Sequence, residues 1–229
     1  MSESQRLRTT ADGLRLVSEI AGELARRGGG QTSVLAVTTY FPMDVDSVAR
    51  VFEGLEEIEG VERVEQGPLT IYEIHDAGRF AQEDGVDLDD PEFLRGAPGF
   101  LRVVGVLKRD QEWLQKVRRQ HELLQLLAEA DERVVDLTYL TSRASMSRAQ
   151  IQSLLNDFDA AGYIGVEFDE DVDKLRYTIP QLDYPQERLE RNMRRLEEVD
   201  PPARTRFSLW VLLAVVAVIV LIVVMLFQW

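Results

Sequence analysis

The chain has 229 residues and no cysteine, and its 40 acidic against 26 basic side chains leave a formal net charge of −14 at pH 7. The absence of cysteine excludes disulfides, thiolate metal sites and cysteine nucleophiles. The acid excess opposes long-range attraction to nucleic acid and to anionic lipid, because both are negatively charged. Basic residues are almost all arginine, which together with the acid excess suits a salt-adapted or GC-rich prokaryote.

The first part of the chain, residues 1–79, predicts a small helical unit that ends in a β-hairpin. Apolar residues at helical spacing mark a first and a third helix, and glycines end both. A short element between them has a pattern that fits either a helix or a strand. The expected elements are a helix over 14–24, the short element over 33–41, a helix capped by Asp44 or Asp46 and ended by Gly60, and a hairpin that turns at 67–68.

Residues 80–106 predict an acidic linker or extension, because 80–99 is rich in Asp, Glu, Gly and Pro. The acidic run at 84–92 lacks the ligand order of a calcium-binding loop. We therefore expect a solvated loop there, without a metal.

The next part, residues 107–181, predicts the same order of elements more clearly. Ser147 and Gln150 form a capping box at the start of a helix that Gly162 ends. Two alternating apolar runs around an acidic turn then predict a hairpin with one buried face. The expected elements are a helix over 110–130, a short helix over 134–141, a third helix from Ser147 and a hairpin over 164–179.

This order, a helix, a helix–turn–helix and a two-stranded hairpin, resembles the winged-helix superfamily. The resemblance is carried by residues 137–164, LTYLTSRASMSRAQIQSLLNDFDAAGYI, which are similar to the helix–turn–helix core of bacterial and archaeal regulators. It implies an α+β fold with two small winged-helix-like modules that bind DNA, RNA or proteins. In arrangement alone, such a tandem is similar to the kleisin-associated subunits of bacterial condensin.

Residues 182–207 predict a charged helix and a Pro/Arg linker. Leu189, Met193 and Leu196 form one apolar stripe on this helix. The stripe fits a stalk, a short homodimer seam, or a helix packed on the second module, because two heptads do not establish a coiled coil.

Residues 208–229 predict a single transmembrane tail anchor. The stretch 209–227 carries no charge, Pro or Gly, and a helix of that length spans roughly the 30 Å core of a bilayer. We expect Arg204, Arg206, Trp210 and Trp229 at the membrane interfaces. The positive-inside bias then predicts a cytoplasmic N-terminal region, with the C-terminus at the outer face of the cell membrane.

Two kinds of binding surface follow from the charges. DNA contact through the second module would use the outward residues Arg143, Ser147, Arg148, Gln150 and Gln152. Basic residues on the preceding helix would widen that footprint: Lys108, Arg109, Lys116, Arg118 and Arg119. The acidic wing opposes DNA, because neutralising phosphates dominates affinity. The third helix of the first module instead offers an acidic face for a basic protein partner: Asp46, Glu53, Glu56 and Glu57.

Catalytic motifs are absent from the sequence. His75 and His121 have no metal-ligand spacing, and we expect His75 in a turn and His121 as a solvated or half-buried packing residue. We predict no catalytic residue, metal or cofactor. The sequence favours a non-enzymatic, tail-anchored adaptor or scaffold that binds a protein partner at the membrane. The alternative is a membrane-tethered transcription regulator that binds DNA through the second module.

Overall fold

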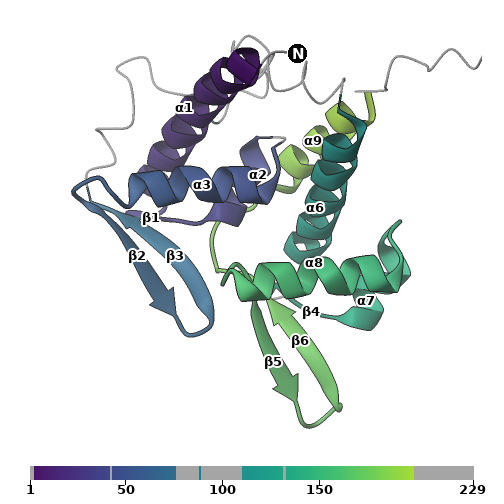
Figure 1. Ribbon diagram of the computed structural model, residues 1–229. Coiled ribbons are helices and arrows are strands. Elements are labelled where there is room, and N and C mark those ends of the chain that lie inside the picture. Colours follow the sequence, from purple (N-terminus) through teal and green to yellow (C-terminus); the bar gives the residue numbers. More distant parts are fainter. Residues whose placement is uncertain (1–2, 42, 76–87, 89–109, 131–132, 199–229) are drawn as a thin grey trace, which may run out of the picture.

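The computed structural model describes residues 3–41, 43–75, 88, 110–130 and 133–198. This part of the chain holds seven helices and two three-stranded antiparallel sheets, which confirms the predicted α+β class (Figure 1). The predicted anchor over 208–229 lies outside the described residues, as does all of the predicted linker over 80–106 except Leu88, which is buried. None of the described helices is both long and apolar enough to cross a bilayer.

The first half consists of three helices and a three-stranded sheet. Its strands follow the order β1-β3-β2. The side chain of Asp44, one of the two expected caps, accepts from the Ser47 N–H at the start of the third helix. The segment 33–41, whose pattern fits either a helix or a strand, forms a helix over Val34–Tyr40. The elements are α1 (Glu3–Arg27), β1 (Gln31–Thr32), α2 (Val34–Tyr40), α3 (Val45–Leu55), β2 (Val61–Gln66) and β3 (Leu69–Ile74).

The second half repeats this order, and its strands follow the order β4-β6-β5. The capping box of Ser147 and Gln150 is present at the start of the helix Arg148–Ala160, and Gly162 follows the end of this helix with a φ of 72°. The elements are α6 (Gln111–Glu129), β4 (Val134–Asp136), α7 (Leu137–Arg143), α8 (Arg148–Ala160), β5 (Gly165–Asp169) and β6 (Lys174–Thr178).

Two predictions for the second half need correction. The helix expected over 134–141 is wrong at its start, because Val134–Asp136 form strand β4 and Asp136 caps α7 by accepting from the Tyr139 N–H at 2.7 Å. The hairpin does not bury one whole face. Tyr177 near its base is 4% exposed, whereas Phe168 and Leu175 near its tip are 57% and 46% exposed, because no other described element packs over the tip.

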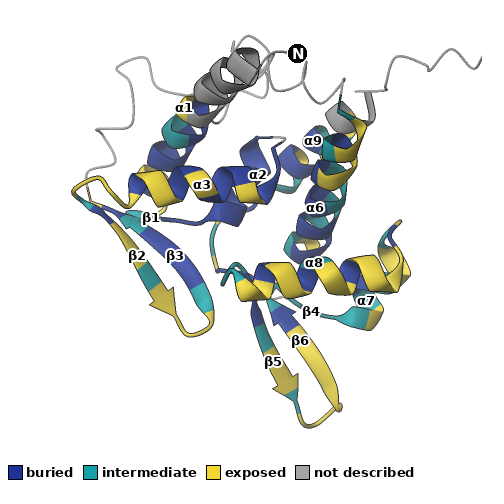
Figure 2. Ribbon diagram, in the orientation of Figure 1, coloured by how far each residue is buried: buried dark blue, intermediate teal, exposed yellow. Residues whose placement is uncertain are grey.

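The last described helix, α9 (Gln186–Glu198), packs against α6 and also against α2 of the first half. Leu189 is fully buried, and the Asn192 side-chain amide donates to the Thr39 carbonyl at 2.7 Å. The helix therefore packs on the second half, as one of the three interpretations held, and contacts the first half as well. Buried apolar residues of both halves form one continuous core (Figure 2).

Candidate functional site

The five residues predicted to contact DNA or a partner share one surface at the end of α7 and the start of α8, and all are exposed. Two of them hold the helix cap, since the Ser147 N–H donates to the Gln150 side-chain oxygen at 2.9 Å. The Arg143 guanidinium lies over the Tyr139 ring, 4.6 Å from its centroid. Arg148 and Gln152 lie further along on the outward side of α8. The five residues are exposed, as expected for outward positions, and three of them also make local contacts: Arg143, Ser147 and Gln150.

Of the basic residues expected to extend this surface, Lys116 makes its contacts elsewhere. Lys116 forms ion pairs with Asp46 and, at 3.6 Å, with Asp44, so its side chain points toward the first half. Lys108 and Arg109 lie outside the described residues, and Arg118 and Arg119 are half-buried. Among the described residues of this cluster, Lys116 is thus engaged by carboxylates of the first half.

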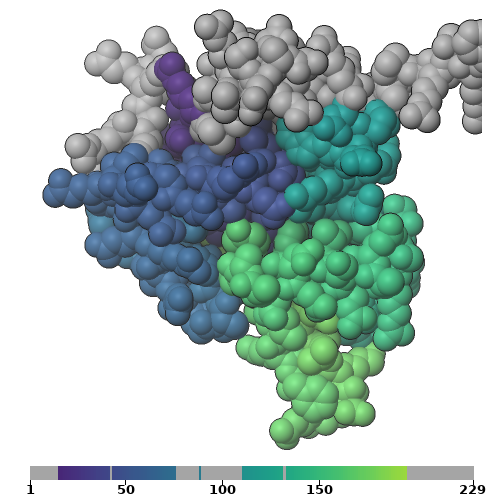
Figure 3. Space-filling view, in the orientation of Figure 1, coloured from purple at the N-terminus to yellow at the C-terminus, as the bar shows by residue number. Residues whose placement is uncertain are grey.

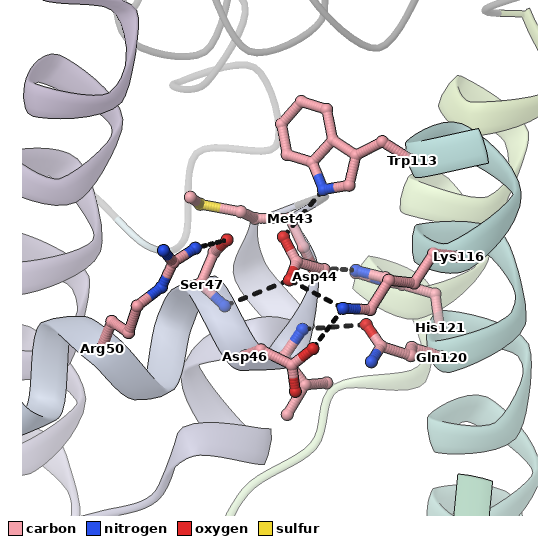
Figure 4. A network of polar contacts seen from close by, with 10 residues as sticks. Met43, Asp44, Asp46, Ser47, Arg50, Trp113, Lys116, Gln120 and His121 are labelled. Atoms are coloured by element: carbon pink, nitrogen blue, oxygen red, sulfur yellow. Dashed lines mark hydrogen bonds and ion pairs between the residues drawn. The ribbon is translucent and has the colours of Figure 1, made fainter. Parts of the chain in front are cut away.

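The contacts of Lys116 belong to a polar junction between α3 and α6 (Figure 4). Its centre is Asp44, 4% exposed, whose carboxylate accepts from the Ser47 N–H at 3.2 Å and from the Trp113 indole N–H at 2.8 Å. Next to it, the Gln120 side-chain oxygen accepts from the Val45 N–H at 2.9 Å. Asp44 thus caps α3 from within its own half, while Gln120 satisfies a further N–H of α3 from the other half. The bonds from Gln120 and Trp113 join the two helices.

His121 completes this junction from α6. Its ring is fully buried, which corrects the expectation of a solvated or half-buried residue. Nε2 lies 3.1 Å from the Met43 carbonyl oxygen, and because that oxygen only accepts, Nε2–H is the donor. Burial lowers the pKa of His121 to about 4, since the charged ring is poorly solvated there. The ring is therefore neutral near pH 7 and acts as a packing and hydrogen-bonding group.

The acidic face predicted for the first half is present in part. Glu53, Glu56 and Glu57 are exposed on α3 and just beyond its end (Figure 2). Asp46 is exposed too, but its carboxylate pairs with Lys116 and so belongs to the junction. The open acidic face consists of the three glutamates, named here the α3 acidic face.

A second contact between the halves was not predicted. The Thr70 N–H, in the first hairpin, donates to the Gly162 carbonyl at 2.7 Å. A Cβ at Gly162 would lie 2.5 Å from the Thr70 hydroxyl oxygen, and one at Gly165 would lie 2.8 Å from Cγ of Pro68. The turn of the first hairpin thus packs on the corner between α8 and β5. Gly165 could have indicated this contact in the sequence, because a glycine inside a strand often marks a place where another backbone segment approaches closely.

In the part of the chain with described side chains, no group of three or more His, Cys, Asp or Glu residues is placed to hold a metal ion. An open groove of about 480 Å³ lies between β4, α7 and the second hairpin, with Tyr139, Lys174 and Arg176 in its lining. Comparison with protein-family models, curated proteins and solved structures found no match to this chain.

Proposed function

We propose that this chain is a non-enzymatic, tail-anchored membrane protein whose two halves are winged helices that bind a protein partner as an adaptor or scaffold. The winged-helix assignment is supported by the order helix, strand, helix, helix, strand, strand in both halves. It is also supported by the sheet order, in which the first strand pairs with the third. The modules correspond to residues 1–79 and 107–181.

The observation that carries the choice of partner is the charge of the exposed surfaces. The α3 acidic face presents three glutamates. On the second hairpin, Lys174 pairs with Asp136 at 2.6 Å and Arg176 pairs with Asp169. The cations that a DNA-binding wing would offer to phosphates are thus already opposed by carboxylates. A basic protein surface complements both faces and would be attracted to them at long range.

The mechanism we propose is co-localisation. An anchor over 208–229 would restrict the adaptor to the membrane surface, and restriction raises the effective concentration of its partner there. The rigid junction around Asp44 holds the α3 acidic face and the α8 surface in one fixed relation, so a partner that spans both would gain from two contacts without ordering a linker.

A membrane-tethered transcription regulator is the second candidate function. It is favoured by the exposed, outward position of Arg148 and Gln152 on α8, because both residue types can bind base edges. It is opposed by Asp157 and Asp159, which are exposed on the same helix.

The deciding experiment is crosslinking of the full-length protein in cells, followed by nuclease treatment and analysis of bound protein and protected DNA. We expect a stoichiometric protein partner and no enriched DNA sequence. Charge reversal of the α3 acidic face, Glu53→Lys with Glu56→Lys and Glu57→Lys, should remove the partner, whereas Arg148→Glu should retain it. Recovery of a short DNA site that is lost with Arg148→Glu would establish the regulator instead.

A further inference from the structure

The second hairpin presents an uncovered apolar surface. Phe168 and Leu175 are directly opposite each other across β5 and β6, next to the pair Val166 and Tyr177. Alternate residues of a strand share a face, so Phe168 and Leu175 continue the face on which Tyr177 is buried. Phe168 is 57% exposed and Leu175 is 46% exposed, and Val172 in the turn is 51% exposed. The apolar face of the hairpin therefore continues past the part that is buried in the core.

Apolar exposure of this kind is concentrated at one place. Among the described residues, three of the four large apolar side chains that are more than a third exposed lie on this hairpin, and Ile58 is the fourth. The hairpin also projects below the rest of the described surface, as its yellow-green tip in Figure 3 shows. Clustered exposed apolar residues with a polar rim typically mark an interaction site. We name Phe168 and Leu175 the wing-tip patch; Val172, in the turn, lines the groove with Lys174 and Arg176.

The rim of the wing-tip patch is acidic. Five carboxylates against two basic residues leave the hairpin over 165–178 with a net charge of −3. Both basic residues are engaged, Lys174 with Asp136 and Arg176 with Asp169. Three exposed carboxylates lie in the turn next to the patch: Glu170, Asp171 and Asp173. Glu167 is exposed too, but it lies on the opposite face of the hairpin.

This combination of charge and apolarity selects one kind of occupant. Anionic lipid would be repelled by the rim, although the patch itself could enter a bilayer. A second copy docked through the same face would bring two acidic rims together, since a two-fold contact pairs each patch with itself. A protein segment with an apolar face flanked by Lys or Arg satisfies both the patch and the rim.

We infer that the wing-tip patch is the docking site for a basic amphipathic segment of the partner protein. This inference rests on the proposed adaptor function and adds a further contact surface to the α3 acidic face. Burial of Phe168 and Leu175 supplies the affinity, and the carboxylates around them select a cationic sequence.

The test uses the full-length protein in nanodiscs of zwitterionic lipid and a fluorescent peptide of Leu and Lys, about five helical turns long, with all leucines on one face. A permuted peptide of the same composition has no apolar face, and a third peptide replaces Lys by Glu. Anisotropy is measured, and binding to protein-free discs is subtracted. We expect the amphipathic Leu/Lys peptide to bind at least about tenfold more tightly than either comparison peptide.

Paired variants separate the patch and its rim from other surfaces. Phe168→Ser with Leu175→Ser should weaken peptide binding by at least about tenfold, because it removes the buried anchors. Ile58→Ser, the matched exposed apolar site, should leave binding unchanged. Glu170→Lys with Asp171→Lys should weaken binding and reduce its salt dependence, whereas Glu112→Lys with Glu187→Lys, at exposed positions on α6 and α9, should do neither. Circular dichroism of each variant checks that the fold is retained.

Several outcomes would overturn this inference. Equal binding of the permuted peptide, or full binding by the Phe168/Leu175 double variant, would show that the patch is not the site. Binding of phosphatidylserine vesicles, or self-association in sedimentation, that the same double variant abolishes would assign the patch to a membrane or to a second copy. If the Phe168/Leu175 double variant still binds the partner in cells, the proposed adaptor function stands and only the docking site is wrong. If crosslinking recovers DNA and no protein partner, the proposed adaptor function itself is wrong.

Discussion

At the scale of single residues, the two aspartates at the start of α3 differ sharply in role. Asp44 is 4% exposed and accepts from Ser47 and Trp113 while it pairs with Lys116. Asp46 has a side chain that is 58% exposed and pairs with Lys116 alone. A buried carboxylate needs such hydrogen bonds to offset its desolvation, whereas an exposed ion pair contributes under about 1 kcal/mol. Asp44 is therefore the structural residue of the pair.

His121 gives the junction a defined pH dependence. Its pKa of about 4 lies below the ordinary histidine value of 6.5, so between these values the unfolded chain binds a proton that the folded chain does not. The free energy of unfolding therefore falls as pH drops from 6.5 toward 4, by up to roughly 3 kcal/mol from this group. We expect urea unfolding of the full-length protein to show this fall, and His121→Gln, which retains a donor for the Met43 carbonyl, to lack this part of it.

The matched control is His75→Gln. The His75 side chain is 57% exposed and this substitution keeps His121, so the fall in stability that His121 causes should remain. If His121→Gln and wild type lose stability equally between pH 6.5 and 4, the ring is not held neutral by burial.

At the scale of elements, the sequence predicted what local signals determine. Ser147 with Gln150 and the terminal Gly162 set the bounds of α8 correctly because caps depend on neighbouring residues only. Strand β1, two residues long, and β4, three residues long, were missed, since they are too short to show a period and form only by pairing with β3 and β6. The alternation of apolar residues also predicted which face of the second hairpin points inward. It did not show that burial of this face ends between Tyr177 and Leu175, toward the tip of the hairpin.

Gly162 links the end of α8 to the first hairpin, and Gly162→Ala should destabilise the protein by about 2 kcal/mol or more. A φ of 72° is unfavourable for alanine, and the added Cβ would meet the Thr70 hydroxyl oxygen at 2.5 Å. Thermal unfolding measures the effect. Gly54→Ala, in the exposed last turn of α3 where a Cβ meets nothing within 4 Å, should stabilise by up to about 1 kcal/mol. Equal effects of the two substitutions would contradict the close contact at Gly162.

At the scale of the whole molecule, the halves are joined by contacts that no local pattern reveals. The bond from Asn192 to the Thr39 carbonyl spans 153 positions, and the bond from Trp113 to Asp44 spans 69. The apolar stripe on α9 predicted that one face of this helix is packed, but not which elements it packs against. Leu189 on this stripe is fully buried, and α9 packs on elements of both halves. A homodimer through this helix stays a prediction, and it would have to use a surface other than that of Leu189.

One cooperative unit should follow from this shared core. Leu189→Ala removes a fully buried side chain, a change that typically costs about 2–5 kcal/mol. Because α9 packs on both α2 and α6, amide hydrogen exchange of the full-length protein should show protection lost by a similar factor in both helices, although they belong to different halves. Glu190→Ala, at an exposed neighbouring position, should change neither. Loss of protection in α6 alone would mean that the halves open independently, and a partner bridging the α3 acidic face and the α8 surface would then have to order them itself.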